Sequence, residues 1–189
     1  RGHDAAGCGP VRSADGHTAR NAARRGPRRL ARLRFPRSRT RLRHFGFVFQ
    51  DGQLLPELTN LDNVALPAML NGLGRRAARA KALSLLDQLG LGDLADRRPA
   101  QVSGGQAQRV TIARALVANP GVIFADEPTG ALDQATGHEV MQMLTTIVRQ
   151  AGASLVMVTH DPKVADWMQR RVEIRDGIIH DDRRLGVIR

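Results

Sequence analysis

Residues 122–133 read VIFADEPTGALD, and this stretch decides how the rest of the chain is interpreted. Its first four residues form a continuous apolar run, as expected of a strand buried on both faces of a parallel sheet. Two carboxylates, Asp126 and Glu127, follow the run directly. The first is placed to hold Mg²⁺ through its water shell, and the second can orient or deprotonate an attacking water. Charged residues also end many ordinary strands, so this pair needs support from other segments.

The segments around this stretch alternate between strand-like and helix-like patterns. We expect strands at 44–50, 122–125 and 155–158, helices at 59–70, 75–89, 103–118 and 133–150, and a hairpin turning at Asp176-Gly177. Strands that alternate with helices predict an α/β fold with a largely parallel sheet. The ligands of such a sheet collect at the carboxyl ends of its strands.

The helix at 103–118 opens with a serine, two glycines and a glutamine. Ser103 and Gln106 have the spacing of a capping box, which is a purely structural explanation. Gly104 and Gly105 are less easily explained by capping, because two consecutive glycines bare backbone N–H groups at the positive end of the helix dipole. The pattern therefore predicts a phosphate cradle, to which the Ser103 hydroxyl can add a hydrogen bond.

Three further polar residues stand at the ends of expected elements. Gln50 ends the first strand, where its amide can contact a metal-bound water or a γ-phosphate. His160 follows the strand at 155–158 and can donate a hydrogen bond to a γ-phosphate oxygen. Asp133 is an obvious helix N-cap. Each also has an ordinary explanation as a surface, loop or capping residue, so a functional role is supported only by the order in which all these elements follow one another along the chain.

Taken in that order, the elements resemble the ATP-binding subunit of ABC transporters over about residues 45–182. FVFQ at 47–50 is similar to the Q-loop, VSGGQAQRVTIARAL at 102–116 to the signature motif and its helix, VIFADEPTG at 122–130 to the Walker B strand with its following glutamate, GALD at 130–133 to the D-loop, and THD at 159–161 to the switch histidine. One branch of the family is most similar: ADEPTGALD at 125–133, DNVALPAML at 62–70 and the short stretch between Gln50 and Ser103 resemble the lipoprotein-release, macrolide-export and cell-division ATPases.

The resemblance implies a P-loop NTPase-like fold that uses ATP and Mg²⁺. Gln50 and Asp126 would contact the metal. Glu127 would polarise the attacking water, and His160 would clamp the γ-phosphate. The chain would then be an ATP-hydrolysing subunit that energises a transporter.

The resemblance also implies partners. Two ATPase domains would meet head to tail, with the signature residues Ser103, Gly104, Gly105 and Gln106 serving the partner's ATP and Asp133 coupling the two sites. A membrane-spanning permease subunit would receive the motion. The expected location is cytoplasmic, peripheral at the inner face of the cell membrane.

The nucleotide-gripping half of the family pattern is missing. A P-loop reads G-x-x-x-x-G-K-[ST], but nothing before Gln50 matches it and no lysine precedes Lys81. We therefore expect a partial ABC ATPase domain at 45–189, with a helical signature subdomain at about 58–118 and with its first strands and P-loop helix missing or non-native. We also expect this incomplete chain to be inactive by itself and marginally stable.

The net charge of +11 lies entirely in residues 1–44, which hold 13 arginines and two aspartates. A basic arm for nucleic acid or anionic lipid is one interpretation. The other is a non-native or disordered leader, for example one read in a shifted frame after truncation. No aromatic residue precedes Phe35 and segment 1–34 shows no helix or strand period, so the leader is favoured and a nucleic-acid partner is not.

Two alternative functions stay open. The first is a non-catalytic subunit that donates its signature motif to a partner's ATP site. The second is a nucleic-acid-associated ABC ATPase that uses the basic amino-terminal segment, although the 52 residues between Gln50 and Ser103 leave no space for the usual coiled-coil or zinc insertions. The single cysteine, Cys8, excludes an internal disulfide framework, and no stretch approaches the roughly 18 apolar residues of a membrane span.

Overall fold

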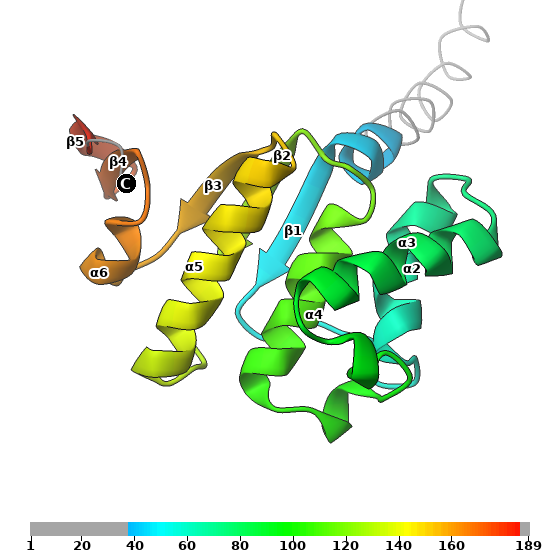
Figure 1. Ribbon diagram of the computed structural model, residues 1–189. Coiled ribbons are helices and arrows are strands. Elements are labelled where there is room, and N and C mark those ends of the chain that lie inside the picture. The colour runs from blue at the N-terminus through cyan, green and yellow to red at the C-terminus, as the bar shows by residue number, and fades with distance from the viewer. Residues whose placement is uncertain (1–37, 186–189) are drawn as a thin grey trace, which may run out of the picture. The chain divides into compact units, whose positions relative to one another are not determined.

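The computed structural model describes residues 38–185 (Figure 1). Three strands form a parallel sheet in the order β1-β2-β3, with bounds β1 (Phe45–Phe49), β2 (Val122–Asp126) and β3 (Ser154–Val158). Two more, β4 (Arg170–Arg175) and β5 (Ile178–Arg184), form an antiparallel hairpin around Asp176-Gly177. The helices between them confirm the predicted α/β fold with a parallel sheet.

The helices lie close to the positions expected from the sequence. Their bounds are α2 (Asn60–Leu70), α3 (Arg75–Gln88), α4 (Gly104–Leu116), α5 (Gln134–Gln150) and α6 (Pro162–Ala165), with short 3₁₀ turns at Gly92–Leu94 and Pro99–Gln101. Capping explains where they begin: the Thr59 hydroxyl accepts from the backbone of Asp62, and Asp161 accepts from Lys163 in the same way. Gly90, with φ of 70°, follows the end of α3, where only glycine adopts this conformation freely.

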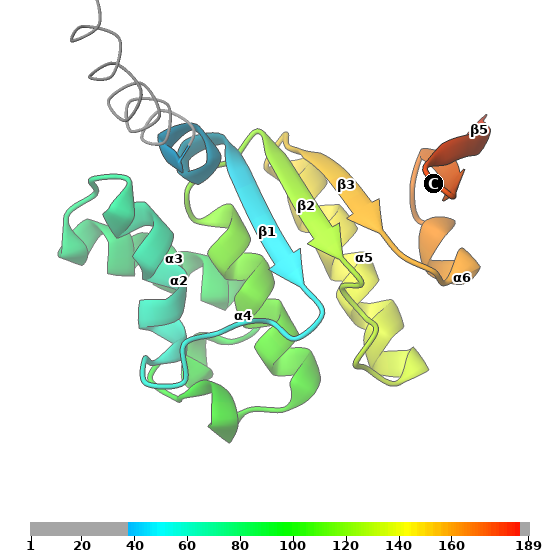
Figure 2. The ribbon, with the colours of Figure 1, turned by 180° about the vertical axis from the view of Figure 1, so that it is seen from behind.

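The strands of the parallel sheet end in step. Phe49 lies opposite Asp126, and Asp126 lies opposite Val158. The residues that follow these three positions therefore share one edge of the sheet, the edge at which the arrowheads of β1, β2 and β3 point (Figure 2).

One face of the sheet is covered by α4 and α5, and Figure 2 shows the opposite face with no described element over it. Ile123 and Ala125 of β2 are buried, whereas Phe124 between them is 36 % exposed and Val158 of β3 is 62 % exposed. The prediction that residues 122–125 form a strand buried on both faces is therefore wrong for the described part of the chain. The physical reason is that the helices of residues 38–185 pack on only one side of the sheet.

The uncovered side carries a row of aromatic rings. We call it the open face and define it as Phe45, Phe47, Phe49, Phe124, Val156 and Val158, which share one side of the sheet by alternation and register. The rings of Phe47 and Phe124 stack with centroids 5.6 Å apart, and Phe45 meets Phe124 edge-on at 5.5 Å. These contacts cover the rings partly, without a second layer of helices.

The second packed region is helical. α2 and α3 pack on each other and on α4, and Val64, Ala82, Leu86 and Ile112 are among its fully buried side chains. These helices lie within residues 58–118, the range for which a helical subdomain is predicted. No helix among residues 38–185 is long and apolar enough to cross a lipid bilayer.

The Arg-rich segment is described only at its carboxyl end. Residues 38–44 are helical and run directly into β1. Asn71 holds this helix by donating a hydrogen bond to the Leu42 carbonyl oxygen at 3.0 Å, and the Arg41 guanidinium lies 6.0 Å from the centroid of the Phe47 ring. The expectation of a non-native or disordered leader falls otherwise on residues 1–37, outside the described residues.

Candidate functional site

The acidic pair lies at the turn that leaves β2. Asp126 is the last residue of the strand, and Glu127 follows with φ of 45°, a left-handed conformation that costs a non-glycine residue energy. The Glu127 N–H donates to the Val158 carbonyl at 2.9 Å, and the Glu127 carbonyl accepts from Gly130 at 3.0 Å. These two bonds fix the turn against the end of β3.

The Glu127 carboxylate meets His160 directly. Its Oε1 accepts from the His160 backbone N–H at 2.7 Å and lies 2.7 Å from His160 Nδ1, while Oε2 accepts from the Thr159 hydroxyl at 3.1 Å. The carboxylate is only 19 % exposed, whereas the imidazole is 87 % exposed. The two residues predicted to be catalytic are thus brought together, with the acid held and the ring open to solvent.

Gln50 lies over the turn that follows Glu127. Its side chain packs against Gly130 so closely that a Cβ on Gly130 would lie 3.0 Å from Gln50 Nε2 and 3.1 Å from Cδ. The Gly130 N–H in turn donates to the Glu127 carbonyl. Gln50, Gly130, Glu127 and His160 therefore form one continuous series of contacts along the edge of the sheet.

The signature segment forms the capping box that its spacing indicates. The Ser103 hydroxyl accepts from the Gln106 N–H at 3.3 Å, and the Gln106 side chain accepts from the Ser103 N–H at 2.9 Å. Gly105 is buried, and a Cβ there would lie 2.5 Å from Thr136 Cγ2. At least one of the two glycines therefore has a packing role inside this chain.

Asp133 caps α5 and joins the signature segment to the acidic turn. Its Oδ1 accepts from the N–H groups of Ala135 and Thr136, both at 3.1 Å. The hydrogen bond from the Thr136 side chain is the largest of the effects that lower the pKa of Asp133. Thr136 thus contacts Gly105 on one side and the Asp133 carboxylate on the other.

The described residues fit a magnesium ion only as part of a larger shell. No group of three or more His, Cys, Asp or Glu side chains in residues 38–185 is arranged to hold a metal ion. Mg²⁺ usually takes one or two carboxylates together with waters and substrate phosphates. The exposed Asp126 carboxylate, on the strand next to the one that Gln50 follows, suits that incomplete set.

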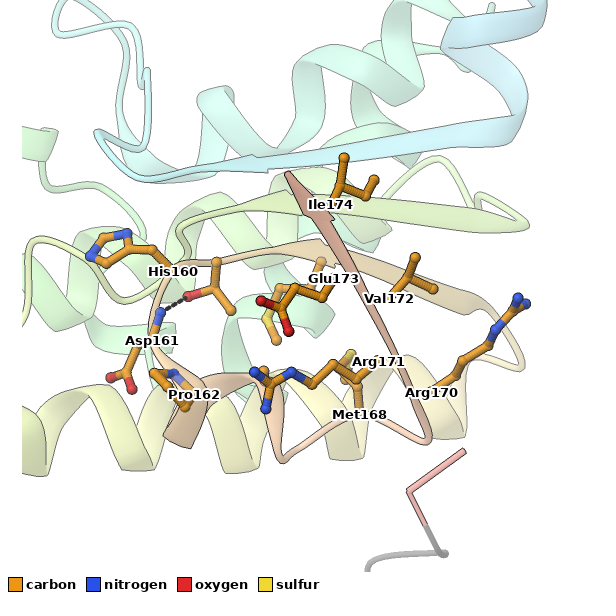
Figure 3. A pocket seen from close by; sticks show the side chains of 12 residues that line it. His160, Asp161, Pro162, Met168, Arg170, Arg171, Val172, Glu173 and Ile174 are labelled. Atoms are coloured by element: carbon orange, nitrogen blue, oxygen red, sulfur yellow. Dashed lines mark hydrogen bonds between the residues drawn. The ribbon is translucent and has the colours of Figure 1, made fainter. Parts of the chain in front are cut away.

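A cavity of about 300 Å³ borders the loop of residues 159–161, which carries His160 (Figure 3). It lies between the end of β3, α6 and β4, and Arg171 and Glu173 face it from β4. The Asp161 N–H donates to the Thr159 hydroxyl at 3.1 Å and fixes the rim, while the His160 ring points away from the arginines (Figure 3). No sequence pattern indicated this cavity, because its walls come from separate elements.

Sequence reasoning missed three residues of α4 that bind the loop after β1: Gln108, Thr111 and Arg114. They stand at intervals of three along a helix whose neighbouring residues are mostly buried and apolar. A polar row at that spacing on a buried helix face is the signal that would have found them, because buried polar groups need hydrogen-bond partners.

Most of the chain is similar to known ABC transporter proteins. The family model described as "ABC transporter" matches residues 19–130, so the match begins inside the Arg-rich segment. The macrolide export ATP-binding/permease protein MacB 1/2 of Paracoccus denitrificans is 52 % identical over 167 residues, which cover 88 % of this chain and 24 % of that protein. MacB of Rhodopseudomonas palustris is 51 % identical over 146 residues, covering 77 % and 22 %. The chain spans about a quarter of the length of these relatives.

Solved structures give the same result. The ATP-binding cassette MJ0796, solved as a dimer in a post-hydrolysis state bound to ADP and Pi, superposes with a TM-score of 0.69 at 41 % identity, covering 78 % of this chain and 66 % of that chain. A second dimeric structure of MJ0796, described as a bacterial ABC transporter cassette, superposes equally well. Since the family model matches more than half of its residues, the chain belongs to the ABC transporter family, as part of an ATP-binding domain.

Proposed function

We propose that this chain supplies the water-activating and signature portions of an ATPase that energises a transporter. The observation that carries the proposal is the contact between Glu127 and His160 at the aligned strand ends, with Gln50 packed on the adjoining Gly130. A carboxylate, an imidazole and an amide in a continuous series at the carboxyl edge of a parallel sheet suit phosphoryl transfer to water.

Each residue then has a separate task. Glu127 orients the attacking water through the carboxylate oxygens that now accept from Thr159 and His160. The His160 ring, being mostly exposed, turns from the carboxylate to donate to a terminal phosphate oxygen without disturbing the core. Asp126 and Gln50 would hold Mg²⁺, which would neutralise developing charge on the phosphates.

The signature segment acts on a second nucleotide. Ser103, Gly104, Gly105 and Gln106 form the amino-terminal tip of α4, where Ser103 and Gly104 are exposed and Gly105 is buried. This tip would contact the ATP of a second ATPase subunit, with Asp133 coupling the two sites. Because no G-x-x-x-x-G-K-[ST] pattern occurs in the 189 residues, the P-loop must come from outside them. The chain would lie in the cytoplasm at the inner face of the cell membrane, and a membrane-spanning permease would receive the motion, as the ATP-binding/permease nature of the MacB relatives suggests.

The absence of that pattern favours one alternative. The chain then acts as a non-catalytic subunit that lends its signature tip to a partner whose own P-loop binds ATP. In this case Ser103 matters for turnover, whereas Glu127 does not. The two functions therefore differ in the effect expected from a single pair of variants.

The experiment mixes the chain with a P-loop-bearing cassette of the MacB type and measures MgATP hydrolysis. We expect no turnover by the chain alone and a rise above the cassette's own rate on mixing. Ser103→Ala should abolish the rise, and Gln142→Ala on the exposed side of α5 should leave it unchanged. A loss with Glu127→Gln as well supports catalysis by this chain, whereas no rise in any mixture contradicts both functions.

A further inference from the structure

The loop that follows β1 has an unusual backbone. Gly52 is buried with φ of 65°, and Gln53 follows with φ of 45°, so two consecutive residues are left-handed. A non-glycine residue in this region is strained and persists only when its surroundings fix it. The backbone around the loop supplies only two short-range hydrogen bonds to these residues. The Gly52 N–H donates to the Phe49 carbonyl at 3.1 Å, and the Gln53 N–H donates to the Asp51 carbonyl at 2.7 Å.

Two neutral side chains of α4 hold the start of this loop. Gln108, which is buried, donates from Nε2 to the Phe49 carbonyl at 3.2 Å. The Thr111 hydroxyl lies 3.3 Å from the Gly52 carbonyl oxygen and 3.2 Å from that of Ala107, and it shares its proton between them. A Cβ on Gly52 would lie 3.0 Å from Thr111 Oγ1, so glycine permits this close approach.

Arg114 makes the strongest of these contacts. Its Nη2 donates to the Gly52 carbonyl and its Nη1 to the Gln53 carbonyl, both at 2.6 Å. No carboxylate in residues 38–185 forms an ion pair with it, and burial lowers the pKa of this guanidinium. Burying half of a cation whose hydrogen bonds within residues 38–185 all go to two loop carbonyls is costly unless those bonds are strong.

The helix that carries Arg114 also carries the signature tip. Ser103 and Gly105 stand at its amino end, and Arg114 stands in its last turn. The loop held by Arg114 presents Gln50, whose side chain packs on Gly130 beside the acidic turn. The helix α4 thus connects the signature tip, through Arg114 and the loop that it holds, to Gln50 at the carboxyl edge of the sheet.

We propose that Arg114 is a positioning residue that fixes the loop of residues 50–53, so that Gln50 stays against Gly130 and moves as one body with the signature tip. The meaning of this coupling for turnover rests on the proposed function, since it assumes that Gln50 and Ser103 both face nucleotide. We call the hold of Arg114 on the loop the clamp, and it depends only on the contacts of the loop with α4.

The first test measures amide hydrogen exchange of the full chain by mass spectrometry, without nucleotide. Arg114→Ala should speed exchange in peptides covering residues 50–55 by about tenfold or more, because it removes two charge-assisted hydrogen bonds. Arg114→Lys, which reaches one carbonyl but not both, should recover part of the protection. Arg76→Ala, at an exposed position of α3, is the matched control and should change nothing in this loop.

The second test follows Gln50 itself by NMR. The nuclear Overhauser contact between its side-chain amide protons and the Gly130 α-protons should disappear in Arg114→Ala and persist in Arg76→Ala. A variant that only loosened the fold would speed exchange in α2 and α4 to the same extent as in the loop, and that result would overturn the proposal. So would unchanged loop exchange with the Gln50 contact intact.

Arg114→Lys keeps the proposal testable if the alanine variant does not fold. Local loss of protection at residues 50–55 in the lysine variant then supports the clamp, and full protection contradicts it. Neither readout involves ATP. If mixing with a P-loop-bearing cassette gives no turnover while the exchange result holds, the proposed function fails and the clamp stands.

Discussion

Gly105 shows how packing alone can require a glycine in the signature segment. A Cβ there would meet Thr136 Cγ2 at 2.5 Å, far inside normal contact. The Thr136 backbone is fixed at the start of α5, where its N–H donates to Asp133 Oδ1 at 3.1 Å, so Thr136 cannot simply move away. At Gly104 the nearest atom would be Leu132 Cδ2 at 3.4 Å, an ordinary contact. The two neighbouring glycines are therefore under different constraints.

Gly105→Ala should lower the free energy of unfolding by about 1–3 kcal/mol, as expected when a methyl group is forced into filled space. Gly104→Ala should be neutral or slightly stabilising, because alanine favours helix. Adding Thr136→Ser to Gly105→Ala removes the clashing methyl group and should restore most of the loss. Urea unfolding followed by circular dichroism measures all three, and equal stability of the two single variants would contradict the packing argument.

Asp133 gives the stability a defined pH dependence. The Thr136 side chain, followed by the backbone N–H groups, lowers the pKa of this carboxyl below its ordinary value of 3.8. A group whose pKa is lower in the folded state stabilises the fold above its unfolded pKa and loses that effect as pH falls through the folded pKa. The contribution is therefore complete at neutral pH and is lost at acid pH.

Asp133→Asn keeps a good cap that does not titrate. Urea midpoints of the two proteins, measured from about pH 6 down to about pH 3, should converge as the pH falls, because only the wild-type chain loses a charged cap. A difference that stays constant over this range would show that the Asp133 charge does not contribute.

At the level of single elements, sequence signals at the ends were enough to predict most helices and strands. Asp133 was expected to cap a helix, and its side chain accepts backbone hydrogen bonds there, as do those of Thr59 and Asp161 at the starts of α2 and α6. The bounds differ from expectation by one or two residues for most elements, and the hairpin turns at Asp176-Gly177 as expected. Local signals suffice here because capping and turn chemistry involve only near neighbours.

Contacts of a helix residue with an irregular segment could not be predicted in the same way. Asn63 lies within α2, and it is 1 % exposed. Its amide donates to the carbonyls of Leu55, Leu58 and Thr59, and its Oδ1 accepts from the Leu55 N–H at 2.7 Å. The helix pattern contains no sign of these partners, because they belong to the irregular segment before the helix.

Asn63→Ala should lower the free energy of unfolding by about 2–4 kcal/mol, since several buried backbone groups of residues 55–59 lose their partner at once. Gln88→Ala, at an exposed position of α3, provides the control and should stay within about 0.5 kcal/mol of the wild type. Chemical unfolding checks both variants, and a small effect of Asn63→Ala would mean that water replaces its hydrogen bonds.

At the scale of the whole molecule, the sequence predicted which residues share the candidate site but not how they touch. The alternation of strands and helices predicted that Gln50, Glu127 and His160 share one edge of the sheet, and the aligned strand ends place them there. The packing of Gln50 on Gly130 and the grip of α4 on residues 49–53 depend on side-chain geometry across long separations in sequence. No local pattern specifies such geometry, so these contacts required coordinates.

The open face sets the expected behaviour of the purified chain. Exposed apolar side chains gathered on one side of a sheet favour association with other apolar surfaces. We therefore expect the purified chain to be marginally stable and to self-associate. The double variant Val156→Thr, Val158→Thr should reduce both light scattering and binding of a hydrophobic dye, because threonine is less apolar but keeps the strand propensity of valine. A cooperative thermal transition above about 60 °C for the wild-type chain would contradict the expectation.

The sheet register also bears on the order in which the chain folds. Among the residues that the structure describes, β1 pairs with β2 alone, and residues 50–121 separate the two strands. Closing so long a loop costs entropy before any strand pairing repays it, whereas α2, α3 and α4 are close in sequence. During synthesis on the ribosome, the three helices can therefore assemble first, and the phenylalanines of β1 must wait for β2 to emerge.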